Sequence, residues 1–349
     1  MTAGPQRGSR LAVGLAGLGT VGMRLGKELR VLPDAEVVAA FDIDADNRRE
    51  AGRTFDLGPE RLFDEYVAML DGADLDAVVV GTPNGLHYEQ ANAALDRDLH
   101  VLLEKPIATD VGDALALTER VEATDRVVML GYQRHLNPAF AAGRERWALG
   151  DAEPTFITGE LTHDWREYFA EMDDWRMDPE LSGGGHLLNV GIHVIEAILW
   201  MTGLTPTRVD AEVEFVDDDL VIDTQSSLRI RFADGTTATV TDTGVVPRAR
   251  EQIHVWDDEG ALYVEGREWN DRTSYTIDVD GTEHDPYRGG VPGKAEAFVE
   301  TVETGGPPPS TARDALWATA VTMAAYESGR RGEPVELTEL YPDLDGFGR

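Results

Sequence analysis

Residues that could do chemistry concentrate in two short segments. The first is Glu104-Lys105-Pro106, which directly follows the apolar run at residues 101–103. Lys105 is one of only three lysines in the chain, and a lysine at the end of a buried strand is an unusual choice unless it has a function. Loss of surrounding water would let such a lysine share a proton. Lys105 is therefore a candidate for proton transfer or charge stabilisation.

The second segment, residues 182–193, reads SGGGHLLNVGIH. If it is helical, spacings of three and four place His186, Asn189 and His193 on one face. A polar stripe on an otherwise apolar helix must be satisfied or functional. Two histidines without a nearby carboxylate make a poor metal site, so no metal is expected. A core histidine bonded to the backbone is the alternative for either ring.

A glycine-rich turn, Gly17-Leu18-Gly19-Thr20-Val21-Gly22, predicts a dinucleotide-binding site. It follows an apolar run at residues 11–16 and precedes a helical pattern. A second apolar run follows at residues 37–41 and is directly followed by Asp42. This order forms the dinucleotide-binding fingerprint. Gly17 permits the tight turn, Gly19 lets the backbone approach a pyrophosphate, and Gly22 lets the helix pack closely. The phosphates would meet the positive end of the helix.

Asp42 bears on the choice between NAD and NADP. A carboxylate at this position can accept hydrogen bonds from both ribose hydroxyls and would repel a 2′-phosphate, which favours NAD. Arg48 and Arg49 lie near enough in the sequence to leave NADP possible. A glycine-rich turn with an exposed aspartate is the simpler alternative.

Other candidates follow the remaining expected strands, because ligands of an open parallel sheet bind at the carboxyl ends of its strands. The polar residues that follow the strands expected at 77–80 and 127–130 are Thr82, Asn84, His87, Gln133 and Arg134. Thr82 and Asn84 could instead do no more than cap a helix.

The first 131 residues alternate apolar strands with amphipathic helices. Helices are expected around residues 46–53, 86–95 and 113–123. Near-continuous apolar strands separated by helices predict a parallel sheet covered on both faces, and right-handed crossovers make it doubly wound. We therefore predict an α/β chain whose residues 1–131 form a Rossmann domain.

The pattern changes from Thr155 onward. Strands with alternating polarity are expected at residues 227–232, 237–241, 252–255 and 261–264, with turns at Asp234-Gly235 and Asp280-Gly281. Helices are expected at 187–201 and 313–328. We predict that residues 132–349 form an α+β domain with a largely antiparallel, open-faced sheet.

The charge of the chain restricts its partners. It carries 65 acidic against 31 basic residues, a formal net charge of −34, and no cysteine. Nucleic acid and anionic membranes are poor partners for such a surface, and disulfides are excluded. The balance is typical of proteins from salt-in halophiles, in which molar salt shortens the screening length to about 3 Å. No apolar run reaches membrane-spanning length, and we expect a cytoplasmic protein.

Together these motifs resemble the Gfo/Idh/MocA oxidoreductase family, from about residue 11 to residue 335. The segments that carry the resemblance are the glycine turn, Thr82-Pro83-Asn84 with His87, Glu104-Lys105-Pro106, Trp175-Arg176, and Gly183-Gly184-Gly185 followed by His193. The resemblance implies that Lys105 contacts the nicotinamide ribose and the substrate, that His193 handles the substrate hydroxyl, and that the Lys105–Pro106 bond is cis.

One position departs from the commonest family pattern, which has an aspartate where this chain has Asn189. An amide cannot accept a proton. Asn189 is therefore expected to orient the substrate by a hydrogen bond, while proton transfer is left to His193 and Lys105.

The resemblance extends the set of expected site residues. Cofactor contacts are expected from the glycine turn and from Asp42, Thr82, Asn84, His87, Glu104, Lys105, Gln133, Trp175 and Arg176. Substrate contacts are expected from Lys105, Gln133, Arg134, His163, Trp165, Arg176, Asn189 and His193.

The predicted function is an NAD-dependent dehydrogenase that moves a hydride to or from a secondary hydroxyl of a sugar, cyclitol or sugar derivative. The alternatives are an NAD-dependent glycosidase and a non-catalytic sensor of dinucleotide or sugar. The family resemblance and the single-faced sheet also predict a homodimer or homotetramer.

Overall fold

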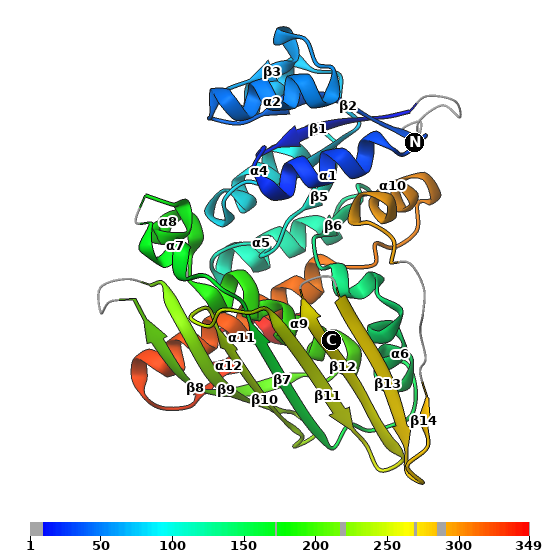
Figure 1. The fold of residues 1–349 in the computed structure, drawn as a ribbon, viewed down its shortest axis with the longest axis vertical. Helices are drawn as coiled ribbons and strands as arrows, with labels where there is room; N and C mark the ends of the chain where they lie inside the picture. The colour runs from blue at the N-terminus through cyan, green and yellow to red at the C-terminus, as the bar shows by residue number, and fades with distance from the viewer. Residues whose placement is uncertain (1–9, 172, 217–220, 269–270, 285–290, 349) are drawn as a thin grey trace. The chain divides into compact units, whose positions relative to one another are not determined.

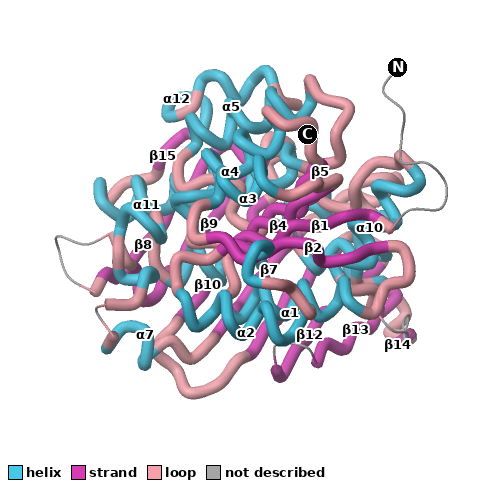
Figure 2. Tube along the Cα trace, turned by 90° about the horizontal axis from the view of Figure 1, so that it is seen from above, coloured by secondary structure: helices cyan, strands magenta, loops and turns pink. Residues whose placement is uncertain are grey.

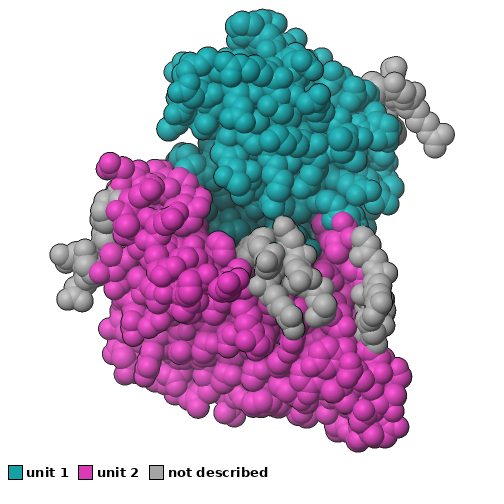
Figure 3. Space-filling view, in the orientation of Figure 1, with its two compact units in different colours: residues 1–107, 116–133, 292–312 teal, residues 108–115, 134–291, 313–349 magenta. Residues whose placement is uncertain are grey.

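The computed structural model describes residues 10–171, 173–216, 221–268, 271–284 and 291–348. The chain forms two compact units, coloured separately in Figure 3. The first contains Met1–Ile107, Ala116–Gln133 and Pro292–Ala312, and the second contains Ala108–Leu115, Arg134–Val291 and Arg313–Arg349. This division differs from the predicted domains 1–131 and 132–349 chiefly because residues 292–312 join the first unit. The physical reason is that helix α10 (Lys294–Thr304) packs against helix α1 (Thr20–Arg30).

A six-stranded parallel sheet is the centre of the first unit. Its strand order is β3-β2-β1-β4-β5-β6. The strands are β1 (Leu11–Ala16), β2 (Ala35–Phe41), β3 (Leu62–Phe63), β4 (Ala77–Val80), β5 (His100–Leu103) and β6 (Val128–Leu130). The order reverses between β1 and β4, which confirms the doubly wound prediction. Sheets of this kind generally bind ligands at the carboxyl ends of the strands where the order reverses.

Helices cover this sheet, so its strands are apolar throughout; the four residues of β4 are fully buried. Figures 1 and 2 show the strands running side by side between helices. Besides α1, the helices of this part of the chain are α2 (Ala45–Phe55), α3 (Tyr66–Gly72), α4 (His87–Leu95) and α5 (Val111–Glu122).

A nine-stranded sheet dominates the second unit, with the order β14-β13-β12-β11-β7-β10-β9-β8-β15. The strands are β7 (Phe156–Thr162), β8 (Pro206–Phe215), β9 (Asp223–Phe232), β10 (Thr237–Thr243), β11 (Arg250–Trp256), β12 (Gly260–Glu268), β13 (Asp271–Asp278), β14 (Glu283–His284) and β15 (Val335–Glu336). Neighbouring strands are antiparallel except β7 and β10, which are parallel. The prediction of a largely antiparallel sheet is confirmed.

One face of this sheet packs on helices and the other is open. Along β9, Leu228 and Ile230 are buried while Arg229 and Arg231 are exposed. Figure 1 shows helices behind the sheet and none in front of it. The helices of the second unit are α6 (Pro138–Arg146), α7 (Arg166–Ala170), α8 (Pro179–Ser182), α9 (Ile192–Thr202), α11 (Ala312–Arg331) and α12 (Leu337–Leu340).

The helix expected at residues 187–201 differs from the prediction at its start. Leu187–Gly191 forms a π-helical turn, and a regular α-helix, α9, begins only at Ile192. The three-and-four spacing of His186, Asn189 and His193 therefore does not lie on one uninterrupted α-helix, because a π turn holds more residues than an α turn. Among the described residues, no helix has the length and apolarity needed to cross a membrane.

Candidate active site

The glycine turn has the geometry that a dinucleotide loop requires. Gly17 has a φ of +82°, and a Cβ there would lie 2.6 Å from the carbonyl oxygen of Gly81. A Cβ at Gly22 would overlap the carbonyl oxygen of Gly17, so only glycine lets α1 start this close to the turn. A Cβ at Gly19 would meet no described atom within 4 Å, which leaves room for a ligand. Gly19 caps α1 without a side-chain bond, so the helix N-terminus suits an anion.

Asp42 lies beside this turn. Its carboxylate accepts hydrogen bonds from the backbone N–H of Leu18 at 2.7 Å, from that of Asp44 at 2.8 Å, and from the Asn47 amide at 3.3 Å. These bonds hold the carboxylate in place and still leave it capacity to accept another donor, because a carboxylate has about four acceptor positions. The site therefore fits an adenosine ribose next to the turn.

Arg48 and Arg49, the residues that left NADP possible, both have partners in the protein. Arg48 donates to the carbonyl oxygens of Asp42 at 2.7 Å and Ile43 at 3.1 Å. Arg49 forms an ion pair with Asp46. A 2′-phosphate would have to compete with these partners and with the Asp42 carboxylate.

The residues after β4 do not cap a helix, which corrects that alternative for Thr82 and Asn84. Pro83 occupies the cap position of the short 3-10 helix that follows, and the Thr82 hydroxyl instead donates to the Gln90 side chain at 2.7 Å. His87 is buried, and its ring nitrogens lie 2.6 Å from the Pro106 carbonyl oxygen and 3.0 Å from that of Thr82. Burial lowers the pKa of His87, although both carbonyls favour its protonated form. His87 thereby ties the end of β4 to the residue after Lys105.

The Glu104-Lys105-Pro106 segment leaves the carboxyl end of β5, next to β4 in the sheet. The Lys105–Pro106 bond is cis, as the resemblance implied. Glu104 is buried and forms an ion pair with Lys294 of α10, a partner that sequence reasoning missed. Burial pushes the pKa of Glu104 upward, but the Lys294 charge and hydrogen bond outweigh it, so this pKa lies below its usual value. Gln133 follows β6, at the end of the same unit.

In the second unit, Asp223 holds the start of the predicted polar helix. Its carboxylate accepts the backbone N–H groups of Gly185 and Leu187, each at 2.8 Å, and the Tyr326 hydroxyl at 2.5 Å. Burial, followed by the charge of Asp242, raises the pKa of Asp223 to about 6. Sequence reasoning missed Asp223 and Tyr326, because nothing near them in the chain marks their role.

The three polar residues of this helix have different surroundings. The Asn189 amide donates to the carbonyl oxygens of Gly184 at 3.0 Å and Gly185 at 2.9 Å. His186 pairs with the buried carboxylate of Asp242. This histidine is therefore a core residue, as the alternative expected, but its partner is a carboxylate and not the backbone. His193 lies in the first turn of α9 and is 2% exposed.

Several residues predicted to contact the substrate or the cofactor lie near one another in the second unit, beside His186. Trp165 meets the His186 ring edge-on, with ring centroids 5.4 Å apart. The Arg176 guanidinium lies 4.6 Å from the Trp175 ring centroid and 5.9 Å from that of Trp165. Burial, followed by the charge of His186, lowers the pKa of His163. His163, Trp165, Trp175 and Arg176 therefore form one aromatic and cationic group in the second unit.

Arg134, an expected substrate contact, takes part in a buried ion pair. Its side chain is 1% exposed, and its Nε donates to Glu251 at 2.5 Å. This interior ion pair gives Arg134 a structural contact.

The described part of the chain contains no cluster of three or more metal-ligating side chains.

Comparisons with known proteins identify the family of the chain. Residues 11–132 match a family model described as "Oxidoreductase family, NAD-binding Rossmann fold", and residues 148–263 match the "GFO/IDH/MocA C-terminal domain". A D-xylose 1-dehydrogenase (NADP(+)) 2 from Haloferax volcanii is 29% identical over 330 residues, which cover 92% of this chain and 98% of the relative. A myo-inositol 2-dehydrogenase from Thermotoga maritima is 22% identical over 95% of this chain and 99% of its own.

The fold also matches solved structures. A scyllo-inositol dehydrogenase from Lactobacillus casei, solved with bound NAD(H) and scyllo-inositol, superposes with a TM-score of 0.79 at 20% identity, over 95% of this chain and all of that one. Because the family models match residues 11–132 and 148–263, most of the chain, the chain belongs to the Gfo/Idh/MocA oxidoreductase family.

Proposed function

We propose that this protein is an NAD-dependent dehydrogenase that oxidises or reduces a secondary hydroxyl of a sugar, cyclitol or sugar derivative. The observation that carries the proposal is the position of Lys105 in the first unit. It follows β5, which pairs with β4, and β4 in turn pairs with β1. The segments that follow β4 and β1 contain His87 and the glycine turn. Relatives named as xylose and inositol dehydrogenases support the substrate class.

The proposed cofactor contacts follow from the glycine turn and Asp42. The N-terminus of α1 would hold the pyrophosphate, and Asp42 would accept the ribose hydroxyls. We propose NAD over NADP because the Asp42 carboxylate opposes a 2′-phosphate, although two haloarchaeal relatives are named as NADP enzymes.

The coenzyme proposal is tested by comparing kcat/KM for NAD and NADP in the unmodified protein and in Asp42→Ala. We expect NAD to be preferred and the substitution to weaken NAD and relax discrimination. A higher kcat/KM with NADP in the unmodified protein would reverse the assignment and make Arg48 or Arg49 the phosphate partner.

When bound, the nicotinamide ring supplies the hydride acceptor or donor. We propose that His193 takes the proton of the substrate hydroxyl and that Lys105 stabilises the negative charge that develops on the same oxygen. Asn189, whose amide is held by the carbonyls of Gly184 and Gly185, would orient the substrate. Trp165 and Arg176 would contribute to the substrate wall.

Turnover of single variants tests these roles. Lys105→Ala and His193→Ala should each reduce kcat on the order of 10²-fold, while the Kd for NAD changes much less. Asn189→Ala should mainly raise KM. The exposed residues Lys27 and His284 offer matched controls, since Lys27→Ala and His284→Ala remove the same side-chain types elsewhere. Near-native turnover of a folded His193→Ala protein would make His193 a packed core residue.

The double variant tests whether both groups serve one transition state. If they do, Lys105→Ala combined with His193→Ala should lose less than the product of the two single losses. Net formation of NADH with a sugar or cyclitol would support a dehydrogenase. Release of an aglycone without net NADH would instead select the glycosidase alternative.

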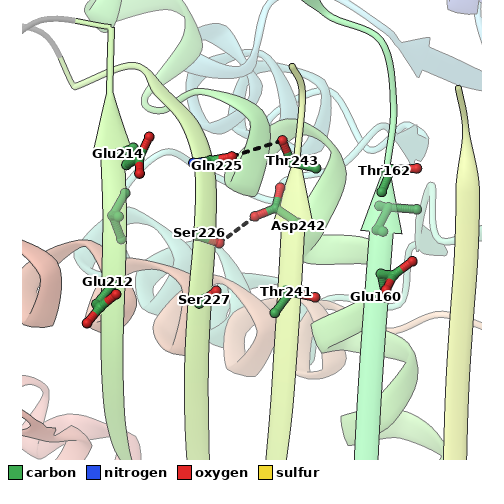
Figure 4. A pocket seen from close by; sticks show the side chains of 12 residues that line it. Glu160, Thr162, Glu212, Glu214, Gln225, Ser226, Ser227, Thr241, Asp242 and Thr243 are labelled. Carbon is green, nitrogen blue, oxygen red and sulfur yellow. Dashed lines mark hydrogen bonds between the residues drawn. The ribbon is translucent and has the colours of Figure 1, made fainter. Parts of the chain in front are cut away.

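We also propose that the protein is a homo-oligomer associated through the open face of the nine-stranded sheet. This face carries Glu160, Glu212 and Glu214 around a polar depression (Figure 4). A second depression carries Arg208, Arg229 and Arg231, of which Arg208 pairs with Glu336 and Arg229 with Asp210. Two copies could associate if these arginines exchange their present partners for glutamates of the other copy. Light scattering in concentrated salt tests this, and a monomeric mass would contradict it.

A further inference from the structure

Lys294 is buried in the first unit, 190 positions along the chain from the carboxylate that it contacts. Its side chain is 5% exposed, and its ammonium donates to the Glu104 carboxylate and to the carbonyl oxygen of Gly131 at 3.3 Å. Glu104 directly follows β5 and Gly131 directly follows β6. One ammonium therefore links the carboxyl ends of two neighbouring strands, including the strand that leads into Lys105.

The link depends on close packing. A Cβ at Gly131 would lie 2.6 Å from a Glu104 carboxylate oxygen, so glycine is what lets the carboxylate reach this position. On the other side, the backbone N–H of Ala295 donates to Glu28 of α1 at 3.4 Å, which holds the start of α10 in place. The ammonium is thus fixed by the fold and is not the tip of a mobile surface side chain.

The charged and titratable groups around Glu104 come from several elements. Lys294 belongs to α10, Arg24 and Glu28 to α1, His87 to α4, and Lys105 is the next residue in the chain. The cations Lys294, Lys105 and Arg24 all favour the ionised carboxylate, and Lys294 has the largest influence among them. Buried charge needs a partner, and here Lys294 supplies it.

We propose that Lys294 is a positioning residue for Lys105: it neutralises the Glu104 carboxylate, so that the carboxylate does not bind the ammonium of Lys105. The chain uses lysine at three positions only, and two of these three ammonium groups act on Glu104. The effect of Lys294 on the charge of Lys105 does not depend on the proposed function. Its expected effect on catalysis does, because that effect requires Lys105 to take part in the reaction.

The consequence follows from charge balance. Without the Lys294 charge, Glu104 becomes an uncompensated buried carboxylate that favours the protonated form of Lys105. Without the Glu104 carboxylate, Lys294 becomes an uncompensated cation, which disfavours the protonated form of Lys105. Removal of both charges together should restore the balance.

The test measures the pH dependence of Lys105 acylation in the cofactor-free protein by peptide mass spectrometry. With three lysines in the chain, each labelled peptide is assigned without ambiguity, and the exposed Lys27 is an internal reference. In Lys294→Met the pH midpoint for Lys105 labelling should rise by about one unit, and in Glu104→Gln it should fall by a similar amount. In the double variant Glu104→Gln/Lys294→Met it should return close to the unmodified value, while the Lys27 midpoint stays constant.

Catalysis supplies a second readout. The pH–kcat profile of Lys294→Met should move to higher pH, with kcat at neutral pH reduced on the order of tenfold and a smaller change in the KM for NAD. A residue that only stabilised the fold would lower the melting temperature without moving either profile. If neither single variant folds, the double variant still makes the test, because it leaves no buried charge unpaired: its Lys105 midpoint should stay close to that of the unmodified protein.

The outcomes separate this inference from the proposed function. Equal labelling midpoints in all folded variants would overturn the role of Lys294, whatever the activity. A shift in labelling, together with full turnover of Lys105→Ala, would support the electrostatic role of Lys294 and contradict the catalytic role of Lys105.

Discussion

Glu104 in the first unit and Asp223 in the second are both buried carboxylates at strand ends, yet their pKa values move in opposite directions. Glu104 faces the ammonium of Lys294, and its pKa is lowered despite burial. Asp223 has neutral donors around it and a second carboxylate, Asp242, nearby, so that its pKa rises to about 6. Burial alone therefore does not set the protonation of a carboxylate; the charge of its neighbours decides.

The two arrangements also hold their sites differently. In the first unit a single ion pair joins two strand ends, and the loss of one partner leaves a charge uncompensated. In the second unit Asp223 accepts hydrogen bonds from two backbone N–H groups and one hydroxyl, so no single partner accounts for all of its stabilisation. The first arrangement should be sensitive to charge, and the second to pH and to single hydrogen bonds.

Removal of salt should have the largest effect, because it acts on the exposed acids of both units. With a formal net charge of −34, we expect the protein to unfold in dilute buffer and to fold in salt on the order of 1 M or more. Circular dichroism during dialysis measures this. The buried Glu104–Lys294 pair is poorly screened, so the stability difference between Lys294→Met and the unmodified protein should change little with salt. An unchanged melting temperature in dilute buffer would contradict the halophile interpretation.

The raised pKa of Asp223 should give the next largest effect. Between about pH 4 and pH 6 the folded state keeps a proton that the unfolded state has lost, so the stability contributed by this group is greatest at low pH and falls as pH rises through about 6. Compared with Asp223→Asn, the unmodified protein should lose about 2 to 3 kcal/mol of unfolding free energy over this range. Urea denaturation in concentrated salt at several pH values measures the difference. A difference that does not change with pH over this range would show that Asp223 is ionised throughout and would contradict the raised pKa.

Tyr326→Phe should have a smaller effect. It removes the hydroxyl that donates to Asp223 and accepts the Leu188 N–H at 3.1 Å, and we expect a loss of about 1 to 2 kcal/mol at neutral pH. The loss should be smaller below pH 5, because the hydroxyl favours the ionised carboxylate. Denaturation of Tyr341→Phe is the control, since this tyrosine is partly exposed. Equal losses at both pH values would separate the tyrosine from the titration of Asp223.

His100 should give the smallest effect, with the opposite sign, because its ring is only partly buried and solvent screens the interactions that shift its pKa. Burial, followed by the charge of Arg126, lowers its pKa to about 4, and its Nδ1 accepts the Val127 N–H at 2.9 Å, which requires a neutral ring. Its contribution is present above about pH 6.5 and is lost as pH falls toward 4. Relative to His100→Asn, the unmodified protein should therefore become less stable on acidification, whereas Asp223 makes it more stable over the same range. If the stability differences for His100→Asn and Asp223→Asn changed with pH in the same direction, the predicted opposite signs for the two units would be wrong.

Much of the first unit could be predicted because its signals are local. The tight turn at Gly17 and the close packing at Gly22 depend on neighbours within a few residues, and the acid at Asp42 ends the next strand. The apolar runs predicted five of the six parallel strands, but not the two-residue strand β3 or helix α3. Helix α10 was not predicted either, and its membership of the first unit depends on packing against α1, far away in the chain.

The second unit was less predictable. Alternating polarity predicted several antiparallel strands, but not β7, β8, β13 or the parallel pairing of β7 with β10. The π turn at Leu187–Gly191 also escaped prediction, since hydrophobic periodicity assumes a regular helix. The partners of its polar residues, Asp223 and Asp242, lie on strands that are adjacent only after folding.

The sequence by itself determined the residue types at each strand end, the glycine turn, and the family to which they point, because these depend on short spacings and on the period of apolar residues. Only the tertiary structure decided which charges meet. Lys294 reaches Glu104 across 190 positions, and Asp242 reaches His186 across 56. Electrostatic and hydrogen-bonding energies depend on distance in space and on burial, and neither is encoded in local spacing.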